Sequence, residues 1–148
     1  MARGGVSFAG IGTQQATFKA GAALVSAVAA NDRDYVVNMP VVITANDTVD
    51  LGVSGAPVFG IVNVYETDKH VGVTFRGFVE GVPVVIDNGG SPYAGATVGS
   101  IVAVNGAGKA QDSEVDVSVA LGIRAPIFVN VGDVGGSPAT ATATVFLG

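Results

Sequence analysis

The sequence contains no cysteine, no tryptophan and only one histidine, His70. Without cysteine, disulfide bonds and thiolate metal sites are excluded. Charged residues make up only 13% of the chain, whereas about 25% is usual. The chain has seven basic residues, scattered along the sequence, and twelve acidic ones, so the net charge is −5. Because nucleic-acid binding usually requires a basic footprint, we expect no nucleic-acid partner.

Long apolar runs are also missing. No segment approaches the length of about 20 residues that a helix needs to cross a bilayer, so we expect no membrane partner. The stretch Ala20–Ala30 (AGAALVSAVAA) is a candidate for the apolar part of a signal peptide. It consists of small residues and lies late in the chain, and we interpret it as mature sequence.

What the chain does contain is apolar residues (49%) and glycine (22 residues). A chain so apolar and so weakly charged is not intrinsically disordered, and its low charge suggests that partners cover much of its surface. Valine and threonine dominate between the glycines, a composition typical of many short strands joined by tight turns. Its 148 residues are enough for one domain with an extended arm.

The N-terminal segment Met1–Gln15 (MARGGVSFAGIGTQQ) differs from the rest of the chain. It is rich in glycine and shows no sustained hydrophobic period. We interpret it as an arm, with Val6, Phe8 and Ile11 as anchors that bind a partner. A frayed terminus is the commoner fate of such segments, but three large apolar residues are unusual in a free tail. Residues 16–148 are then a single β domain.

Several short segments of this domain have the composition or the period-two alternation of strands. Ala16–Ala30 is ambiguous between a strand and a short helix, because alanine favours a helix and its β-branched neighbours do not. Asn46–Asp50 is predicted as a polar turn, and Asn105-Gly106 is a strong hairpin signal. The predicted strands are Val36–Val37, Val41–Thr44, Val58–Tyr65, Val71–Phe75, Val82–Ile86, Val98–Val104, the segment starting at Lys109–Gln111, Val115–Val119, Ile127–Val131 and Thr140–Leu147. This spacing predicts an all-β sandwich or small barrel.

Catalytic chemistry has few candidates in this sequence. His70 is predicted on the polar face of its strand with Thr74 and Arg76, and Asp68 is near. No serine lies in a G-x-S-x-G elbow, so a solvated histidine is the favoured interpretation. Paired carboxylates would suggest a glycosidase, but the three glutamates lie in unrelated segments: Glu66, Glu80 and Glu114. We therefore expect no enzyme.

Metal and phosphate sites are weakly supported as well. Acidic and amide side chains cluster at Asn31–Asp34, Asn46–Asp50 and Asp87–Asn88. Calcium favours such oxygens, but no spaced loop with a closing Glu is present, and Asx turns account for the clusters. Gly106–Lys109 is similar to a phosphate-binding loop but lacks its spacing, and Gly10-Ile11-Gly12 lacks a third glycine. We read both as turns, and we expect no metal and no cofactor.

One part of the sequence resembles a known family. Val58–Gln111 contains VFGIVNVYETDKHVGVTFRGFVEGVPVV, and later YAGATVGSIVAVNGAGKAQ. A strand is followed by V-x-F-R-G-F-V-E-G-V-P, and Ala-Gly-x-x-Val-Gly precedes a strand ending in Val-Asn-Gly-Ala-Gly-Lys. These segments, a third to a half of the chain, resemble the small capsid cement or head-decoration proteins of tailed phages, which have a compact β-barrel or β-tulip domain.

The resemblance implies a structural role on the outer surface of a virion. Proteins of this kind sit outside the capsid at three-fold or quasi-three-fold positions, often as homotrimers, and bridge neighbouring subunits of the major capsid protein. The alternatives are another virion component, such as a minor capsid, fibre or tail part, or a soluble ligand-binding or enzymatic β domain. A concave pocket with converging polar groups would favour the latter.

Overall fold

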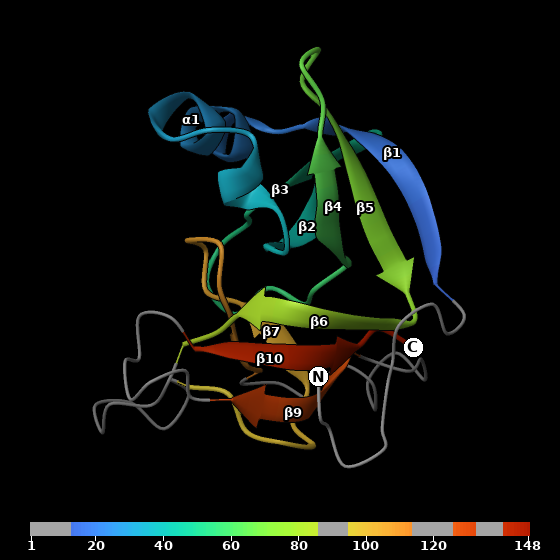
Figure 1. Ribbon diagram of the computed structural model, residues 1–148, viewed down its shortest axis with the longest axis vertical. Helices are drawn as coiled ribbons and strands as arrows, with labels where there is room; N and C mark the ends of the chain where they lie inside the picture. Colours follow the sequence, from blue (N-terminus) through green and yellow to red (C-terminus); the bar gives the residue numbers. More distant parts are fainter. Residues whose placement is uncertain (1–12, 86–94, 114–125, 133–140) are drawn as a thin grey trace.

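The computed structural model describes residues 13–85, 95–113, 126–132 and 141–148. These residues form a mostly β structure with one α-helix, which confirms the predicted all-β fold (Figure 1). In chain order the elements are β1 (Gln14–Ala20), α1 (Ala22–Ala30), the 3₁₀ helix η1 (Asp34–Val36), β2 (Pro40–Ala45), β3 (Thr48–Asp50), β4 (Gly60–Tyr65), β5 (His70–Arg76), β6 (Phe78–Pro83), β7 (Val102–Val104), β8 (Ala110–Asp112), β9 (Ile127–Gly132) and β10 (Thr142–Phe146).

Five strands close a small barrel in the order β1-β3-β2-β4-β5. β1 completes the ring by pairing antiparallel with β5 and parallel with β3. The barrel forms the upper half of the molecule in Figure 1, and α1 and η1 lie beside it. Leu24 of α1 and Val36 of η1 are completely buried, so both helices contribute to the barrel core. The other buried members of this core are Met39, Val41, Val49, Leu51, Val62, Tyr65, Val71 and Val73.

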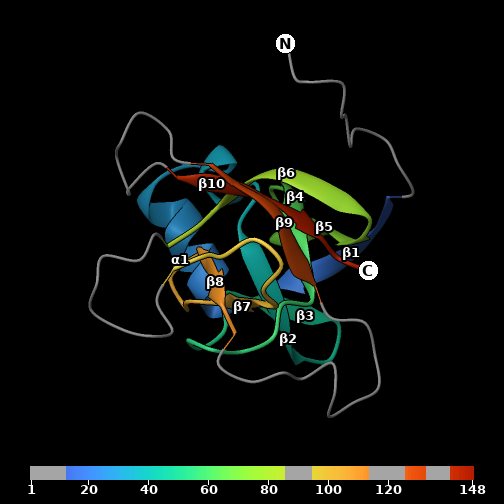
Figure 2. The same cartoon turned by 90° about the horizontal axis from the view of Figure 1, so that it is seen from below.

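The remaining strands form a second layer below the barrel. β6, β10 and β9 make one sheet, and β7 and β8 make a hairpin (Figure 2). Single bridges connect these pieces, Ile101 with Ile127 and Val84 with Ala110. The strands thus run around a second core, in which Phe128 is 1% exposed. The other buried members of this core are Val42, Val58, Ile61, Val82, Val84, Val102, Val104, Ala110, Ala141, Ala143, Val145 and Leu147.

The two cores share elements. Val42 of β2 and Ile61 of β4 pack into the second core, although both strands are part of the barrel. Glycine permits close approach at the junction, since a Cβ on Gly108 would lie 2.5 Å from Sδ of Met39. No linker between separate units is therefore found among the described residues.

The ambiguous segment Ala16–Ala30 contains both a strand and a helix. β1 ends at Ala20, Gly21 is the extended N-cap residue, and α1 begins at Ala22. The carboxylate of Asp50 in β3 caps the helix: Oδ2 accepts a hydrogen bond from the Ala23 N–H (3.1 Å), and Oδ1 accepts one from Leu24 (2.9 Å). A Cβ on Gly21 would lie 2.3 Å from Oδ2 of Asp50. Only glycine leaves room for this cap.

Three local predictions were wrong. The predicted strand Val36–Val37 is not formed, since Val36 ends η1 and Val37 is its C-cap residue. Oδ1 of Asp32 accepts the Tyr35 N–H, which starts a helical turn there. The predicted turn Asn46–Asp50 is shorter, since Thr48–Asp50 forms β3. Thr74 was expected on a polar face but is 6% exposed, because its neighbours across the sheet, Ile61 and Gln15, flank it on both sides.

The remaining predicted strands within the described residues were found, with shifted ends. The alternation in the last strand is confirmed, because Ala141, Ala143, Val145 and Leu147 are all buried. The Asn105-Gly106 hairpin joins β7 to β8, with Val104 opposite Ala110. β6 begins at Phe78, four residues before the predicted Val82–Ile86 run. The Val115–Val119 strand lies outside the described residues.

Candidate partner-binding surface

His70 and Asp68 lie together in the hairpin between β4 and β5. Oδ1 of Asp68 accepts a hydrogen bond from the His70 backbone N–H (3.2 Å). Nδ1 of His70 lies 3.1 Å from Oδ2 of Asp68, without the geometry of a hydrogen bond. Their side chains are 41% and 64% exposed. His70 is thus partly exposed, as the sequence predicted, although its Nδ1 atom is itself buried and has no hydrogen-bond partner.

Side chains of the acidic and amide clusters, which were candidates for calcium ligands, form hydrogen bonds with main-chain groups. Asp50 caps α1 and also accepts the Leu51 N–H (2.9 Å), and Oδ1 of Asp32 accepts the Tyr35 N–H in the first turn of η1 (2.9 Å). Thr48 donates its hydroxyl to the Asn46 carbonyl. Within the described ranges no three His, Cys, Asp or Glu side chains are grouped so as to hold a metal ion. Asp87–Asn88 lies outside these ranges.

The glycine-rich loop Gly106–Lys109 is the turn of the β7–β8 hairpin, as predicted. Oδ1 of Asn105 accepts hydrogen bonds from the N–H groups of Ala107 (2.8 Å) and Lys109 (3.0 Å). These donors are already paired, so they do not point at a phosphate. Gly10-Ile11-Gly12 lies outside the described residues.

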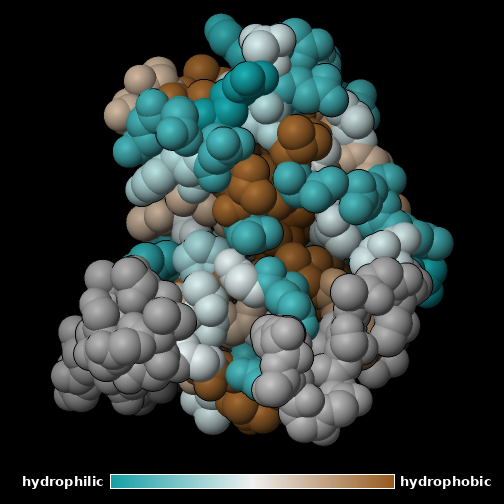
Figure 3. All heavy atoms as spheres, viewed as in Figure 1, coloured by the Kyte–Doolittle hydropathy of each residue, from teal (hydrophilic) through white to brown (hydrophobic). Residues whose placement is uncertain are grey.

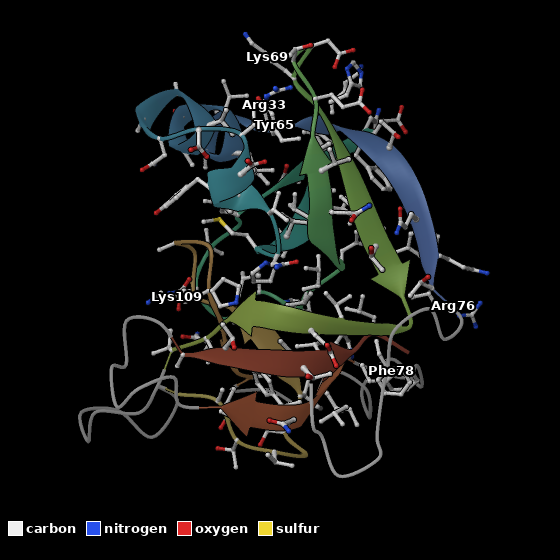
Figure 4. All side chains as sticks on the ribbon, viewed as in Figure 1. Arg33, Tyr65, Lys69, Arg76, Phe78 and Lys109 are labelled. Atoms are coloured by element: carbon white, nitrogen blue, oxygen red, sulfur yellow. The ribbon has the colours of Figure 1, made fainter. Side chains whose placement is uncertain are left out.

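Charged side chains are concentrated at one end of the molecule. Figure 4 shows Arg33 and Lys69 at the barrel end, where α1, η1 and the β4–β5 hairpin meet, and Arg76 at the opposite end of β5. The described charged residues at the barrel end are Lys19, Asp32, Arg33, Asp34, Asp47, Asp50, Glu66, Asp68 and Lys69; those elsewhere are Arg76, Glu80, Lys109 and Asp112. Acidic residues outnumber basic ones at the barrel end, and the remaining described surface has few charges.

An incomplete part of the barrel wall lies along β1, the curved strand on the right of Figure 1. β1 pairs with β5 over its whole length, but it meets β3 only at Lys19 and Ala20. The first half of β1 extends past the turn that precedes β3. On this side Lys19 N–H binds the Asp47 carbonyl, whereas Ala20 N–H points to β5 and binds Lys69.

Because main-chain groups alternate along a strand, the N–H and C=O groups of Gln15 and Thr17 point to the side away from β5. No described strand pairs with them there. We call Gln14–Thr17 the open edge. Its four residues are uncharged and exposed. Asn63 of β4 donates a side-chain hydrogen bond to Oε1 of Gln15 (2.9 Å) and holds this half of β1 against the sheet.

Aromatic rings lie on the inner side of the open edge. The phenylalanine cluster consists of Phe18, Phe59 and Phe75. Phe18 meets Phe59 edge-on, with ring centroids 5.3 Å apart, and Phe59 stacks on Phe75 at 6.0 Å. All three rings are only partly buried. Ala16 lies opposite the buried Val73, so it faces the barrel interior, yet it is exposed. Ala16 is therefore uncovered at this edge, although the core residues Val71 and Val73 beside it are fully buried.

Further apolar side chains are visible on the surface. Figure 3 shows apolar residues along the middle of this face, and smaller groups at its upper left and its lower edge. Exposed large apolar residues in the described part are Tyr35, Ile43, Val53, Val64 and Val98. Ile43 lies opposite Val49, whose side chain is in the barrel core. Its 48% exposure is thus a second place where an inward-facing residue is uncovered.

The anchors predicted from the sequence, Val6, Phe8 and Ile11, lie outside the described residues. The predicted arm ended at Gln15, and the structure places Gln14 and Gln15 in β1. The open edge itself was missed by the sequence prediction. Its signal in the sequence is weak, since Gln15, Thr17 and Lys19 alternate with Ala16 and Phe18, which is the pattern of a half-buried strand.

The helix α1 has nine residues and is too short to cross a membrane. Within the described ranges, no helix is both long enough and apolar enough to do so. Comparisons with family models, with curated proteins and with solved structures found no match to this chain.

Proposed function

We propose that this protein is a structural component of a virion that binds the outside of a viral capsid and stabilises it by bridging neighbouring subunits. The observation that carries the proposal is the open edge beside the phenylalanine cluster. An unpaired strand edge is a template for pairing with another chain, and partly exposed rings next to it supply apolar contacts. Recognition by strand addition needs no active site.

The resemblance to head-decoration proteins supports the same role. It rests on strand and glycine motifs in Val58–Gln111, and the described parts of that segment form β4 to β8. The chemistry of the described surface is compatible with a protein partner, because the edge Gln14–Thr17 is uncharged. In this proposal the partners are the major capsid protein and further copies of the chain, arranged as a homotrimer, and nucleic acid and membrane are not partners.

The N-terminal arm provides the proposed anchors Val6, Phe8 and Ile11. Ordering flexible residues costs about 1–2 kcal/mol each, whereas burying a large apolar side chain returns about 1.5–3 kcal/mol. Three such side chains offset only part of the cost for an arm of this length. Main-chain hydrogen bonds to a strand edge would have to contribute the remainder.

The proposal is tested with virus particles purified without this protein. Folded protein is added, the particles are pelleted, and the bound protein is quantified and located by particle reconstruction. We expect saturable binding at three-fold or quasi-three-fold positions of the head and a higher temperature of particle disruption. Density on the tail or on fibres would instead support another virion component. Absence of binding to any part of the particle would contradict a virion role.

A truncated protein tests the arm. Because β1 begins at Gln14, the deletion should remove residues 1–12 and leave the strand intact. We expect the truncated protein to fold and to pellet with particles more weakly than the full chain. Equal binding would show that the arm is no anchor, and failure to fold would show that it belongs to the domain.

A further inference from the structure

We propose that the open edge of β1 receives the N-terminal arm of a neighbouring copy of this protein, which adds a strand to the barrel. This inference rests on the proposed function, in which copies of the chain contact one another. It names the surface that accepts the arm, and it names the face of the arm that is buried.

The first argument is the main chain of the edge. Gln15 and Thr17 each direct an N–H donor and a C=O acceptor away from β5, and no described strand takes them up. Natural proteins usually protect such edges with charges, proline or bulges. Here a register shift between Gln14 and Gln15 disturbs only the start of the strand, and no residue of Gln14–Thr17 is charged. An extended segment can therefore pair at this edge without repulsion.

The second argument is the side chains behind the edge. Ala16 and Phe18 lie opposite Val73 and Val71, so they face the barrel interior. Ala16 is exposed and Phe18 is partly buried. A strand added to this edge would place every second side chain over them and against the phenylalanine cluster. The segment that fits must alternate apolar and small or polar residues, because its other face remains in solvent.

The arm has this pattern over one short stretch. Val6 and Phe8 are two residues apart, with Ser7 between them and Ala9 after them. In a strand Val6 and Phe8 share one face. Phe8 is large, and Ala16 on β1 is small, so Phe8 opposite Ala16 would fill the space beside the rings. Twelve residues precede Thr13, and an extended chain spans about 3.3 Å per residue, which is enough to reach an adjacent molecule.

We assign the edge to the arm of a neighbouring copy, because the proposed function brings copies of the chain into contact. In the described residues the four side chains of the open edge are exposed, and Ala16 is uncovered although it faces inward. Exchange of arms around a ring of copies would cover the edge in each of them. Such a head-to-tail contact closes naturally in a cyclic trimer.

The test uses the absence of cysteine from the chain. One preparation carries Ser7→Cys in the arm and a second carries Thr17→Cys at the edge; both positions lie on the solvent face of the proposed pair. The full-length proteins are mixed at high concentration and treated with a short bis-maleimide. We expect a cross-linked dimer that contains one copy of each variant, with a yield that rises with concentration. Glu66→Cys, exposed in the β4–β5 hairpin, replaces Thr17→Cys in the control and should give no such dimer above background.

Two substitutions test the side chains. Phe8→Asp, or Thr17→Pro, which removes an edge donor but no β5 hydrogen bond, should lower the cross-linking yield at least five-fold. Ser7→Asp and Thr17→Ala are the matched controls and should not. The cysteine of the arm is moved to Ala9 for the Ser7 control, and the cysteine of the edge is moved to the exposed Lys19 for both Thr17 variants. If the mixed dimer fails to form and a single chain with Ser7→Cys and Thr17→Cys links to itself, the arm folds back on its own edge and arm exchange is wrong. If neither link forms, the arm does not bind the edge.

These measurements need no virus particle. A mixed dimer from a protein that does not bind particles would overturn the proposed function and leave the arm exchange standing. Particle binding at full strength by the two cysteine variants, Ser7→Cys and Thr17→Cys, without any mixed dimer between them, would overturn the arm exchange and leave the proposed function standing.

Discussion

The cap that Asp50 forms on α1 gives a quantitative prediction. Its carboxylate accepts three backbone N–H groups, those of Ala23, Leu24 and Leu51, at 2.9 to 3.1 Å. Replacing a capping side chain by alanine costs about 1 kcal/mol on average and about 2 kcal/mol at most. Asp50→Ala removes all three hydrogen bonds and the negative charge at the helix N-terminus. We therefore expect the upper value, about 2 kcal/mol.

The variant Asp50→Asn distinguishes the contributions of the two carboxylate oxygens to the stability of the protein. The amide of asparagine has one oxygen acceptor. If this oxygen takes the position of Oδ1, it still accepts the N–H groups of Leu24 and Leu51, but the acceptor for the Ala23 N–H and the negative charge are lost. A charge near a helix N-terminus contributes about 0.3–1 kcal/mol, so the loss for Asp50→Asn should be about 1 kcal/mol. Asp34→Ala is the matched control, because Asp34 is also exposed near this helix and accepts nothing through its described side chain.

Equilibrium unfolding in urea measures these differences. With a slope of about 2 kcal/mol/M, the midpoint should fall by about 1 M for Asp50→Ala and about 0.5 M for Asp50→Asn, and the slope should not change. A midpoint for Asp50→Ala within the error of the Asp34→Ala control would refute the reasoning. Equal losses for both Asp50 variants would show that the second oxygen and the charge do not contribute.

Three further measurements follow from packing and chemistry. Gly60→Ala should lower the free energy of unfolding by about 3 kcal/mol, since a Cβ there would lie 2.5 Å from Val73 and 2.6 Å from the Thr74 carbonyl. The control Gly99→Ala meets open space but has φ +86°, so it should lower the free energy of unfolding by about 1 kcal/mol. A larger loss for Gly99→Ala than for Gly60→Ala would contradict the packing argument. Phe128→Ala should cost about 3–5 kcal/mol in the same assay, and a loss below about 1 kcal/mol would mean that the second core is not well packed. Treatment with EDTA should leave the melting temperature unchanged, because Asp32 and Asp50 already bind backbone N–H groups; a drop of many degrees would show a bound cation.

The fold class could be predicted because its signals are local. Period-two alternation identified β5 and β10, and Asn105-Gly106 identified the β7–β8 hairpin. Each of these patterns involves neighbours in the sequence, and the structure keeps them together.

The elements that were missed depend on contacts between distant residues. The N-terminus of α1 is capped by Asp50, which lies 26 residues after Leu24 in the chain. The sequence of Ala20–Ala30 contains no signal that predicts this cap. β3 is only three residues long, and its strand character comes from pairing with β1 and β2 on both sides. The open edge was invisible for the same reason, because it exists only where β1 extends past the start of β3.

The way the two cores are joined bears on the proposed role. A protein that bridges capsid subunits must transmit tension between its contacts without yielding at a hinge. β1, which bears the open edge, pairs with β5, and β5 pairs with β4. Ile61 of β4 is 1% exposed and packs into the second core. A load on the open edge would therefore pass through main-chain hydrogen bonds of three strands into the lower layer. Because β4 belongs to both cores, separating them would expose buried apolar surface on either side, and this resists extension more strongly than a flexible linker could.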